Sequence, residues 1–209
     1  MIVQWCIKGM AFDDDDDAAK SLVESRSGIL CNWWRDVGQI RPQEIRDKLI
    51  DGNLNLHVNH FTAIDPATKR EFRELTPFIS LTAGTVERDT AAKTNIIHRA
   101  RATALWFGTR FGQSDHAYLY TCWVVVAPRA AVTIEGVAEE VRDLNAYRRY
   151  SQFQTEGEMI AKISVPDNQI RDCQKWVWNR DGKFFEKMWA HENSRFTQPE
   201  QLSNIRELI

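Results

Sequence analysis

The 209-residue chain lacks the sequence features that mark several broad classes of protein. No apolar run approaches the roughly 20 residues that a membrane-spanning helix needs. The four cysteines form no Cys-x-x-Cys pair, which argues against a zinc site. There is neither a GxGxxG nor a GxxxxGK[ST] phosphate loop, and there are no internal repeats. The net charge of −2 argues against a strong bulk attraction to nucleic acid or an anionic membrane, although it is compatible with a local basic patch.

The N-terminus also lacks the basic region, long apolar region and small-residue cleavage site of a secretory signal. We therefore expect a cytoplasmic protein, or a mature piece delivered into a target cell. A content of 43% hydrophobic and 27% charged residues is ordinary for a globular protein. The length fits a single domain over residues 1–209, with a polar, peripheral tail after about residue 191. Cys6, Cys122 and Cys173 lie in apolar stretches and are expected to be small core residues, although their spacing leaves disulfides open.

Hydrophobic periodicity predicts strands and helices that do not alternate regularly, which argues against a doubly wound parallel sheet. The β-branched and aromatic run 118–127 should be a central strand buried on both faces. The run of aspartates at 13–17 should be a solvated loop or a helix start. The other expected strands are 2–9, 54–60, 78–82, 159–165 and one from 176 that pairs with 184–188. The expected helices are 18–24, 28–50 with a break near Pro42, and 91–107, while 65–75 should be a loop and 138–148 a short helix or loop.

Two glutamates flank a glycine where an apolar strand is predicted to begin. Side chains at i and i+2 of a strand point the same way, so Glu156 and Glu158 are expected to face one cleft. The aromatic Phe153 lies three positions before Glu156. Two converging carboxylates beside an aromatic ring suit chemistry on a glycosidic bond, where positive charge develops on a sugar. The alternative, two glutamates on the wet face of a half-buried strand, stays open.

The order of four sequence blocks resembles a known enzyme family. The blocks are an N-terminal strand with a cation, the strand 78–82, a long helix followed by an aromatic and valine-rich strand, and Phe-x-x-Glu-x-Glu opening a strand. This order is similar to that of the mono-ADP-ribosyltransferases of the arginine–serine–glutamate type, particularly the cholera toxin catalytic subunit and its relatives. The stretch 53–57 is similar to a strand before their serine motif, 78–82 looks like that motif, and 156–170 looks like their Glu-x-Glu strand. The resemblance spans roughly residues 2–176 and is specific mainly in 76–84 and 150–170.

This resemblance implies an α+β fold, with an ADP-ribosyltransferase-like core of two packed, mostly antiparallel β-sheets around a NAD cleft and with flanking helices. It also implies NAD as substrate and no metal. Nicotinamide leaves NAD as a neutral molecule, so the enzyme needs no general acid but must stabilise an oxocarbenium-like ribose. Glu158 would bind the ribose 2′-hydroxyl and counter that charge. Glu156 would accept the proton of, or orient, the incoming nucleophile.

Further residues receive roles from the same resemblance. Ser80 and Thr82 would brace the catalytic glutamate and line the NAD cleft, and His57, with His60 beside it, could reach that cleft. The alternatives are an outer strand face for the two hydroxyl residues and structural roles for the histidines.

The segment before the glutamates would meet the acceptor. Phe153 and Tyr150 would contact it, with a core anchor as the alternative for Phe153. Family members with Glu rather than Gln at the position of Glu156 often modify arginine, so a protein guanidinium is the first expectation. The cluster Arg142, Arg148 and Arg149 leaves a nucleic acid acceptor open.

One departure concerns the first motif of the family, an arginine on the N-terminal strand. Here Trp5–Gly9 contains Lys8 instead. Lysine can neutralise a phosphate but lacks the planar fork of arginine. Either Lys8 substitutes for it, or Arg35, Arg41 or another group takes the role, or the enzyme is degenerate. Lys8 as a plain surface residue is a further alternative.

The leading interpretation is a NAD-dependent, toxin-like mono-ADP-ribosyltransferase that acts on a macromolecule. It would be delivered as a bacterial effector, or used inside its own cell in a toxin–antitoxin or phage-defence system, with an antitoxin or inhibitor protein as partner and no membrane. The alternatives are a catalytically degenerate nucleotide- or protein-binding module of the same fold, and a NAD glycohydrolase.

Overall fold

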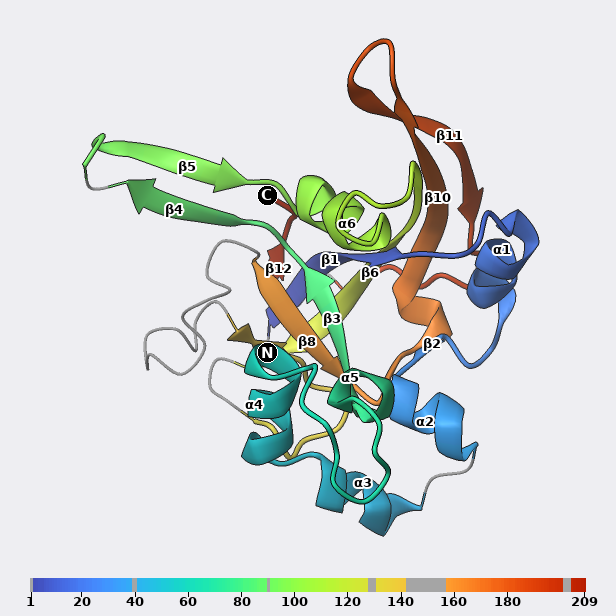
Figure 1. Ribbon diagram of the computed structural model, residues 1–209, viewed down its shortest axis with the longest axis vertical. Coiled ribbons are helices and arrows are strands. Elements are labelled where there is room, and N and C mark those ends of the chain that lie inside the picture. Colours follow the sequence, from blue (N-terminus) through green and yellow to red (C-terminus); the bar gives the residue numbers. More distant parts are fainter. Residues whose placement is uncertain (1, 39–40, 90, 128–130, 142–156, 201–203) are drawn as a thin grey trace.

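A computed structural model describes residues 2–38, 41–89, 91–127, 131–141, 157–200 and 204–209. Within these ranges the dominant feature is one large sheet in the order β11-β10-β6-β1-β3-β8-β7, with β12 beside β1 (Figure 1). The strands are β1 (Ile2–Met10), β3 (Phe78–Thr82), β6 (His116–Val126), β7 (Glu139–Glu140), β8 (Glu158–Lys162), β10 (Ile170–Asn179), β11 (Phe184–Glu192) and β12 (Asn204–Arg206). Neighbours along the order pair antiparallel, and β12 pairs parallel to β1.

The sheet consists of two halves that meet at a single residue pair. β1 pairs with β6 from Ile2 to Met10, and β3 pairs with β8 along its whole length, but β1 and β3 are joined at Ile7 and Thr82 alone. β3 and β8 accordingly run across the direction of β1 and β6 (Figure 1). The expected α+β fold with mostly antiparallel sheets is confirmed. The divergence of the halves leaves room for a cleft beside Ile7 and Thr82.

β6 is buried on both faces, as its β-branched and aromatic run predicted. Tyr118, Tyr120 and Cys122 face the main core, while Ala117 and Leu119 belong to a second cluster beneath α6 (Ala100–Gly108). Successive strand residues point to opposite faces, so these two sets separate as alternation requires. β6 is therefore the strand around which both layers pack.

The aspartate run starts a helix and ties it to the sheet. Asp15 caps α1 (Asp16–Glu24) by accepting from the Ala18 N–H at 2.8 Å. Asp16 accepts from the Tyr118 hydroxyl at 2.7 Å, from Lys175 Nζ at 2.8 Å and from Trp189 Nε1 at 2.9 Å. Burial acts to raise the pKa of Asp16, but these hydrogen bonds together with the Lys175 charge lower it to about 2. The predicted helix at 18–24 is thus confirmed, and its acidic start has defined partners.

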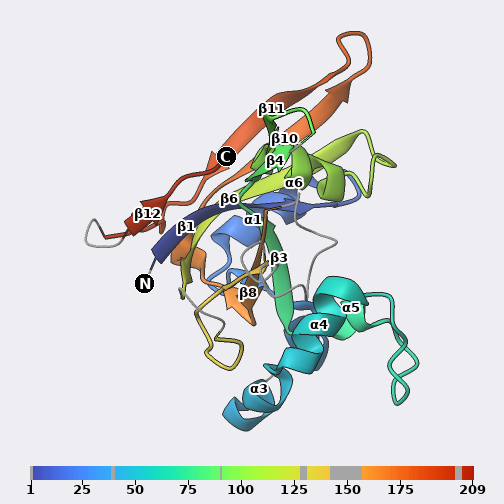
Figure 2. The same ribbon diagram turned by 90° about the vertical axis from the view of Figure 1, so that its left-hand side faces the viewer.

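Short helices and two small ribbons complete the described fold. The helices α2 (Asn32–Val37), α3 (Pro42–Lys48), α4 (Asp51–Asn59) and α5 (Phe72–Leu75) lie below the sheet in the view of Figure 1. The ribbons are β2 (Ile29–Leu30) with β9 (Ser164–Val165), and β4 (Thr85–Asp89) with β5 (Thr94–His98), and a 3-10 turn covers Asp167–Gln169. Figure 2 shows α3, α4 and α5 together on one side. None of the described helices is long and apolar enough to cross a membrane.

Several expectations of secondary structure were wrong in whole or in part. Helix α5 occupies Phe72–Leu75 of the expected loop 65–75, and strand β2 occupies Ile29–Leu30 of the expected helix 28–50. Residues 54–59 of the expected strand 54–60 lie in helix α4, which His60 caps, and Leu54 and Val58 are buried four residues apart on one helical face. The expected helix 91–107 begins only at Ala100, because Asp89 accepts hydrogen bonds from the Ala91 and Ala92 N–H groups and closes a turn between β4 and β5.

Other expectations are confirmed in outline. The strand after Glu158 divides at Ile163, whose φ of 65° interrupts it before β9. The break at Pro42 separates α2 from α3, and β10 and β11 pair as expected for residues 176–188. The expected short helix or loop 138–148 is wrong at Glu139 and Glu140, which form the short strand β7, while residues 142–148 lie outside the described residues.

The tail after residue 191 is less peripheral than expected. β12 pairs with the start of β1, and Arg206 donates two hydrogen bonds to the Glu140 carboxylate at 2.8 and 3.0 Å. The last residue, Ile209, donates to the Ala83 carbonyl at 3.0 Å and accepts from the Ala100 N–H at 2.8 Å. The four cysteines, whose pairing the sequence left open, are all free and buried.

Candidate active site

A cavity of about 430 Å³ lies where the two halves of the sheet diverge. Its walls come from β1, β3, the start of β8, and the helices α2, α4 and α6. Lys8, His57, Ser80, Thr82 and Glu158 all line it. The fold thus brings together five of the predicted site residues from segments as far apart in sequence as β1 and β8. Their roles stay predictions, because their placement alone does not test them.

Glu158 is the first residue of β8 and is buried beside β3, directly opposite Thr82. Gly157 just before it has a φ of 58°, a conformation that favours glycine. A Cβ on Gly157 would lie 2.2 Å from the carbonyl oxygen of Gly84, and the Gly157 carbonyl accepts from the Ala83 N–H at 3.0 Å. This close backbone crossing fixes where the Glu158 side chain enters the cavity.

The same glycine corrects the argument that placed both glutamates on one strand face. Alternation applies only to extended backbone, and β8 begins at Glu158 after the left-handed Gly157. Glu156 itself lies outside the described residues. Its predicted role beside Glu158 therefore rests on the resemblance of the Glu-x-Glu stretch and not on strand geometry.

Lys8 projects from β1 into the cavity and is half-buried. Burial lowers its pKa to about 8, the Glu158 carboxylate acts to raise that pKa, and the Arg35 guanidinium acts to lower it. The next residue, Gly9, allows β1 to approach α6, since a Cβ there would lie 2.0 Å from the Ala104 carbonyl oxygen. Lys8 is therefore a cleft cation in electrostatic contact with Glu158, not a plain surface residue.

His57 links two hydroxyl groups on the α4 side of the cavity. Its Nδ1 lies 2.8 Å from Thr76 Oγ1, and its Nε2 lies 2.9 Å from Ser80 Oγ. Burial, with a further contribution from the Lys8 charge, lowers the pKa of His57 to about 3. A neutral imidazole has one N–H donor and one acceptor, so His57 donates to one hydroxyl and accepts from the other. It therefore orients the Ser80 hydroxyl at the cleft wall.

Several cavity residues were missed or left open by sequence reasoning. Arg35, weighed as a substitute cation, does line the cavity, as does the unpredicted Arg73. The Arg35 guanidinium donates to the Asn32 side chain, and Asn32 Nδ2 donates to the Arg73 carbonyl at 2.6 Å. The aromatic residues Phe61, Phe107 and Phe111 complete the mouth. No local pattern signals these residues, because they reach the cavity only through the packing of α2, α5 and α6.

The other predicted residues are either absent from the described lining of this cavity or lie outside the described residues. His60 is exposed at the end of α4, and Arg41 precedes α3; neither is among the described residues that line the cavity. The two acceptor residues, Phe153 and Tyr150, and the arginines Arg142, Arg148 and Arg149 lie outside the described residues.

The fold is similar to those of several solved structures. EcPltA superposes with a TM-score of 0.54 at 10% sequence identity, covering 99% of this chain and 94% of that one. An arginine-to-lysine mutant of heat-labile enterotoxin gives a TM-score of 0.48 at 15% identity, covering 96% of this chain and 81% of that one. Nicked CARDS toxin gives 0.42 at 10% identity, covering 98% and 33%. No protein-family profile and no curated protein matches the sequence.

These likenesses concern the fold, since the identities are 10–15%. The EcPltA superposition covers 99% of this chain and so includes both halves of the large sheet. The chain therefore shares the fold of EcPltA, in agreement with the expected ADP-ribosyltransferase-like fold.

Proposed function

We propose that the protein is a NAD-dependent mono-ADP-ribosyltransferase that transfers ADP-ribose to a macromolecular acceptor. The observation that carries the proposal is the buried Glu158 facing a cleft that also holds the Lys8 ammonium and the oriented Ser80 hydroxyl. The fold supports the same activity class. The cavity volume of about 430 Å³ lies in the range of small-molecule sites.

In the proposed reaction, the bond between nicotinamide and ribose C1′ breaks, and its electron pair leaves with nicotinamide, which becomes neutral. Positive charge then develops on the ribose ring. A buried carboxylate at Glu158 would stabilise this charge more strongly than an exposed one, because little water screens it. An acceptor nucleophile attacks C1′ and gives up a proton, for which Glu156 is the proposed base.

The cations of the cleft suit the other part of NAD. Lys8 would neutralise one phosphate, and Arg35 and Arg73 at the same cavity would supply bidentate donors. In this proposal the arginine role of the family is divided between a lysine and guanidinium groups from α2 and α5. Thr82, opposite Glu158 in the β3–β8 pairing, would brace the carboxylate.

The acceptor and setting are part of the proposal. A protein arginine is the first acceptor, because Glu rather than Gln stands at position 156. Nucleic acid is the second acceptor. A toxin-like role, either after delivery into a target cell or in a toxin–antitoxin or phage-defence system with an inhibitor protein, fits this activity.

A second function, nucleotide binding without turnover, is favoured by Lys8 itself. Lysine holds a phosphate as a point charge and does not fix it through a planar fork. With lysine in this position, the cleft would bind NAD but would not orient it for bond cleavage.

One experiment separates these functions. The wild-type protein and the Glu158→Gln variant are incubated with radiolabelled NAD and mixed cellular protein and RNA. Transfer of label by wild type, reduced on the order of 10²–10³-fold or more in the variant, supports the transferase. Free ADP-ribose alone identifies a glycohydrolase. Binding of NAD by calorimetry with no product in either protein identifies the binding module.

A further inference from the structure

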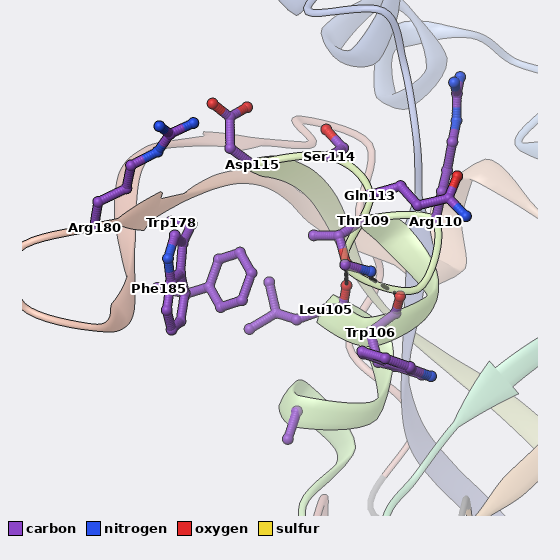
Figure 3. A pocket seen from close by; sticks show the side chains of 12 residues that line it. Leu105, Trp106, Thr109, Arg110, Gln113, Ser114, Asp115, Trp178, Arg180 and Phe185 are labelled. Atoms are coloured by element: carbon purple, nitrogen blue, oxygen red, sulfur yellow. Dashed lines mark hydrogen bonds between the residues drawn. The ribbon is translucent and has the colours of Figure 1, made fainter.

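A second and larger cavity, of about 890 Å³, lies on the other side of α6 from the candidate active site. It is formed by α6, the loop that follows it and the β10–β11 hairpin (Figure 3). Thr103, Ala104 and Phe107 of α6 face the candidate active site, whereas Ala102, Leu105 and Trp106 face the second cavity. One helix thus separates the two sites.

The floor of the second cavity is apolar and aromatic. Trp178 and Phe185 are directly opposite in the β10–β11 pairing, with ring centroids 5.1 Å apart in an edge-on contact. Figure 3 shows the side chains of Phe185 and Leu105 pointing toward one another. Trp178 and Trp106 leave 37% and 55% of their surface exposed. Large exposed apolar side chains that lie together mark an interaction site.

The turn between the two cavities has an unusual backbone. Arg110 and Phe111 have φ angles of 53° and 61°, and Gly112 follows at 80°. The left-handed conformation costs free energy at each of two consecutive non-glycine residues. A folded protein keeps such a strained conformation where other contacts hold the backbone in it. Buried Thr109 enforces it here: its hydroxyl donates to the Leu105 carbonyl at 2.8 Å and accepts from the Gly112 N–H at 3.0 Å. The turn directs Phe111 to the active-site cavity and Arg110 to the second cavity.

The charges at the rim favour an anionic occupant. The lining contains the guanidinium groups of Arg110 and Arg180 and one carboxylate, that of Asp115. Arg110 pairs with Asp13 at 2.9 Å and Asp115 with His116 at 3.1 Å, both at the surface, whereas Arg180 has no ion pair among the described residues. The described lining includes no lysine and no glutamate. Protein–protein interfaces are enriched in tryptophan, phenylalanine and arginine and depleted in lysine and glutamate relative to the rest of the surface. The lining of this cavity has that composition.

We propose that this second cavity docks the acceptor protein, through a segment that places an apolar side chain on Leu105, Trp178 and Phe185 and a flanking carboxylate at Arg180. The proposal rests on the transferase function proposed above. The aromatic ridge of Trp106, Phe107 and Phe111, whose ring centroids lie 5.4–6.0 Å apart, runs from this cavity to the mouth of the NAD cleft. An acceptor held in the second cavity would present its modified residue across that ridge. Two rim guanidiniums and a net charge of −2 make nucleic acid the weaker occupant.

The test uses the full chain and a library of twelve-residue peptides in which a central leucine, phenylalanine or alanine is flanked by glutamate, glutamine or lysine. We expect the wild-type protein to retain leucine and phenylalanine peptides with glutamate flanks. Arg180→Glu should weaken that binding about tenfold. The matched control is Arg26→Glu, which makes the same charge change at an exposed residue of neither cavity. Trp178→Ala should weaken binding similarly, and thermal unfolding of each variant separates this loss from a loss of folding.

Three results would overturn the docking site. They are a library with no peptide retained, retention that is equal in wild type and Arg180→Glu, and retention of poly(U) in place of the acidic peptides. A transfer assay then links the site to the reaction. Arg180→Glu should lower label transfer to protein about tenfold while leaving NAD binding and the release of ADP-ribose to water unchanged. If acidic peptides bind but wild type and Glu158→Gln are equally inert toward NAD, the transferase function fails and the site loses its acceptor role. If NAD is turned over but no peptide binds, the docking proposal alone fails.

Discussion

The Nε2 atom of His57 lies 2.9 Å from the Oγ atom of Ser80, and this contact joins helix α4 to strand β3 at the wall of the cleft. Because Thr76 occupies the other ring nitrogen at 2.8 Å, the imidazole is held at both ends. A charged imidazolium would have to donate to both hydroxyls beside the Lys8 ammonium, so burial and that neighbouring charge keep the ring neutral.

The neutral His57 should make the fold less stable in acid. Its pKa in the folded protein is about 3, below the value of about 6.5 in an unfolded chain. The unfolded state therefore binds the proton first, and stability falls as the pH drops from about 6.5 toward 3. Urea unfolding at pH 7 and pH 4.5 should show a smaller acid loss in His57→Asn than in wild type. His60→Asn, at an exposed position, is the control; an equal acid loss in wild type and His57→Asn would contradict the prediction.

Binding of NAD should weaken as the pH rises through 8. Burial lowers the pKa of Lys8 to about 8, so at pH 9 only about a tenth of the free protein carries the cation. Calorimetry at pH 7 and pH 9 should show a loss of up to about tenfold in affinity for wild type. Lys8→Arg keeps its charge over this range and should remove the pH dependence, whereas Lys8→Met should bind weakly at both values. An unchanged wild-type affinity at pH 9 would exclude Lys8 as the phosphate cation.

Gly157→Ala should impair activity more than its cost in backbone strain would suggest. A Cβ there would lie 2.2 Å from the Gly84 carbonyl oxygen, so β3 and the start of β8 must move apart, and Glu158 with them. Gly136→Ala is the matched control, because Gly136 also has a positive φ, of 76°, but an added Cβ meets nothing within 4 Å. We expect about 1–2 kcal/mol of destabilisation in the control and more in Gly157→Ala. Denaturant unfolding and label transfer measured on both variants check this.

The buried ion pair between β8 and β7 should show strong coupling. Lys162 Nζ lies 2.8 Å from Glu139 Oε1, with both side chains at most 2% exposed, and also donates to the Ala131 and Ile134 carbonyls. Burial lowers the pKa of Lys162 although Glu139 opposes this. Lys162→Met should cost about 3–5 kcal/mol because it leaves a buried carboxylate without its cation.

A double-mutant cycle tests that coupling. The double variant Lys162→Met with Glu139→Leu should recover part of the loss, since neither charge is then buried alone. Urea unfolding of the four proteins measures the coupling energy. If the two single losses simply add in the double variant, the pair is not coupled as described.

Sequence reasoning succeeded where burial and local pattern agree. The run 118–127 is apolar at nearly every position, and β6 is accordingly central. Phe78–Thr82 and the segment from Glu158 are short apolar stretches that predicted strands, whereas the pairing that sets Glu158 opposite Thr82 is seen only in the folded chain. It failed for residues 54–60, where leucine and valine at 54, 56 and 58 fit a strand, while 54 and 58 also fit one face of a helix.

By itself, the sequence determined most strands of the central sheet, all but β7 and β12, and it marked Lys8 and Glu158 as candidate cleft residues. Tertiary structure decided what surrounds them. Helix α4 places His57 beside Ser80, and the three cations of the described cleft lining lie on β1, α2 and α5. The second cavity is formed where the β10–β11 hairpin packs against α6. Hydrophobic periodicity predicts which side of a segment is buried, but it does not predict which distant segment covers that side. The contacts that build both cavities join such distant segments, and so only the folded chain shows them.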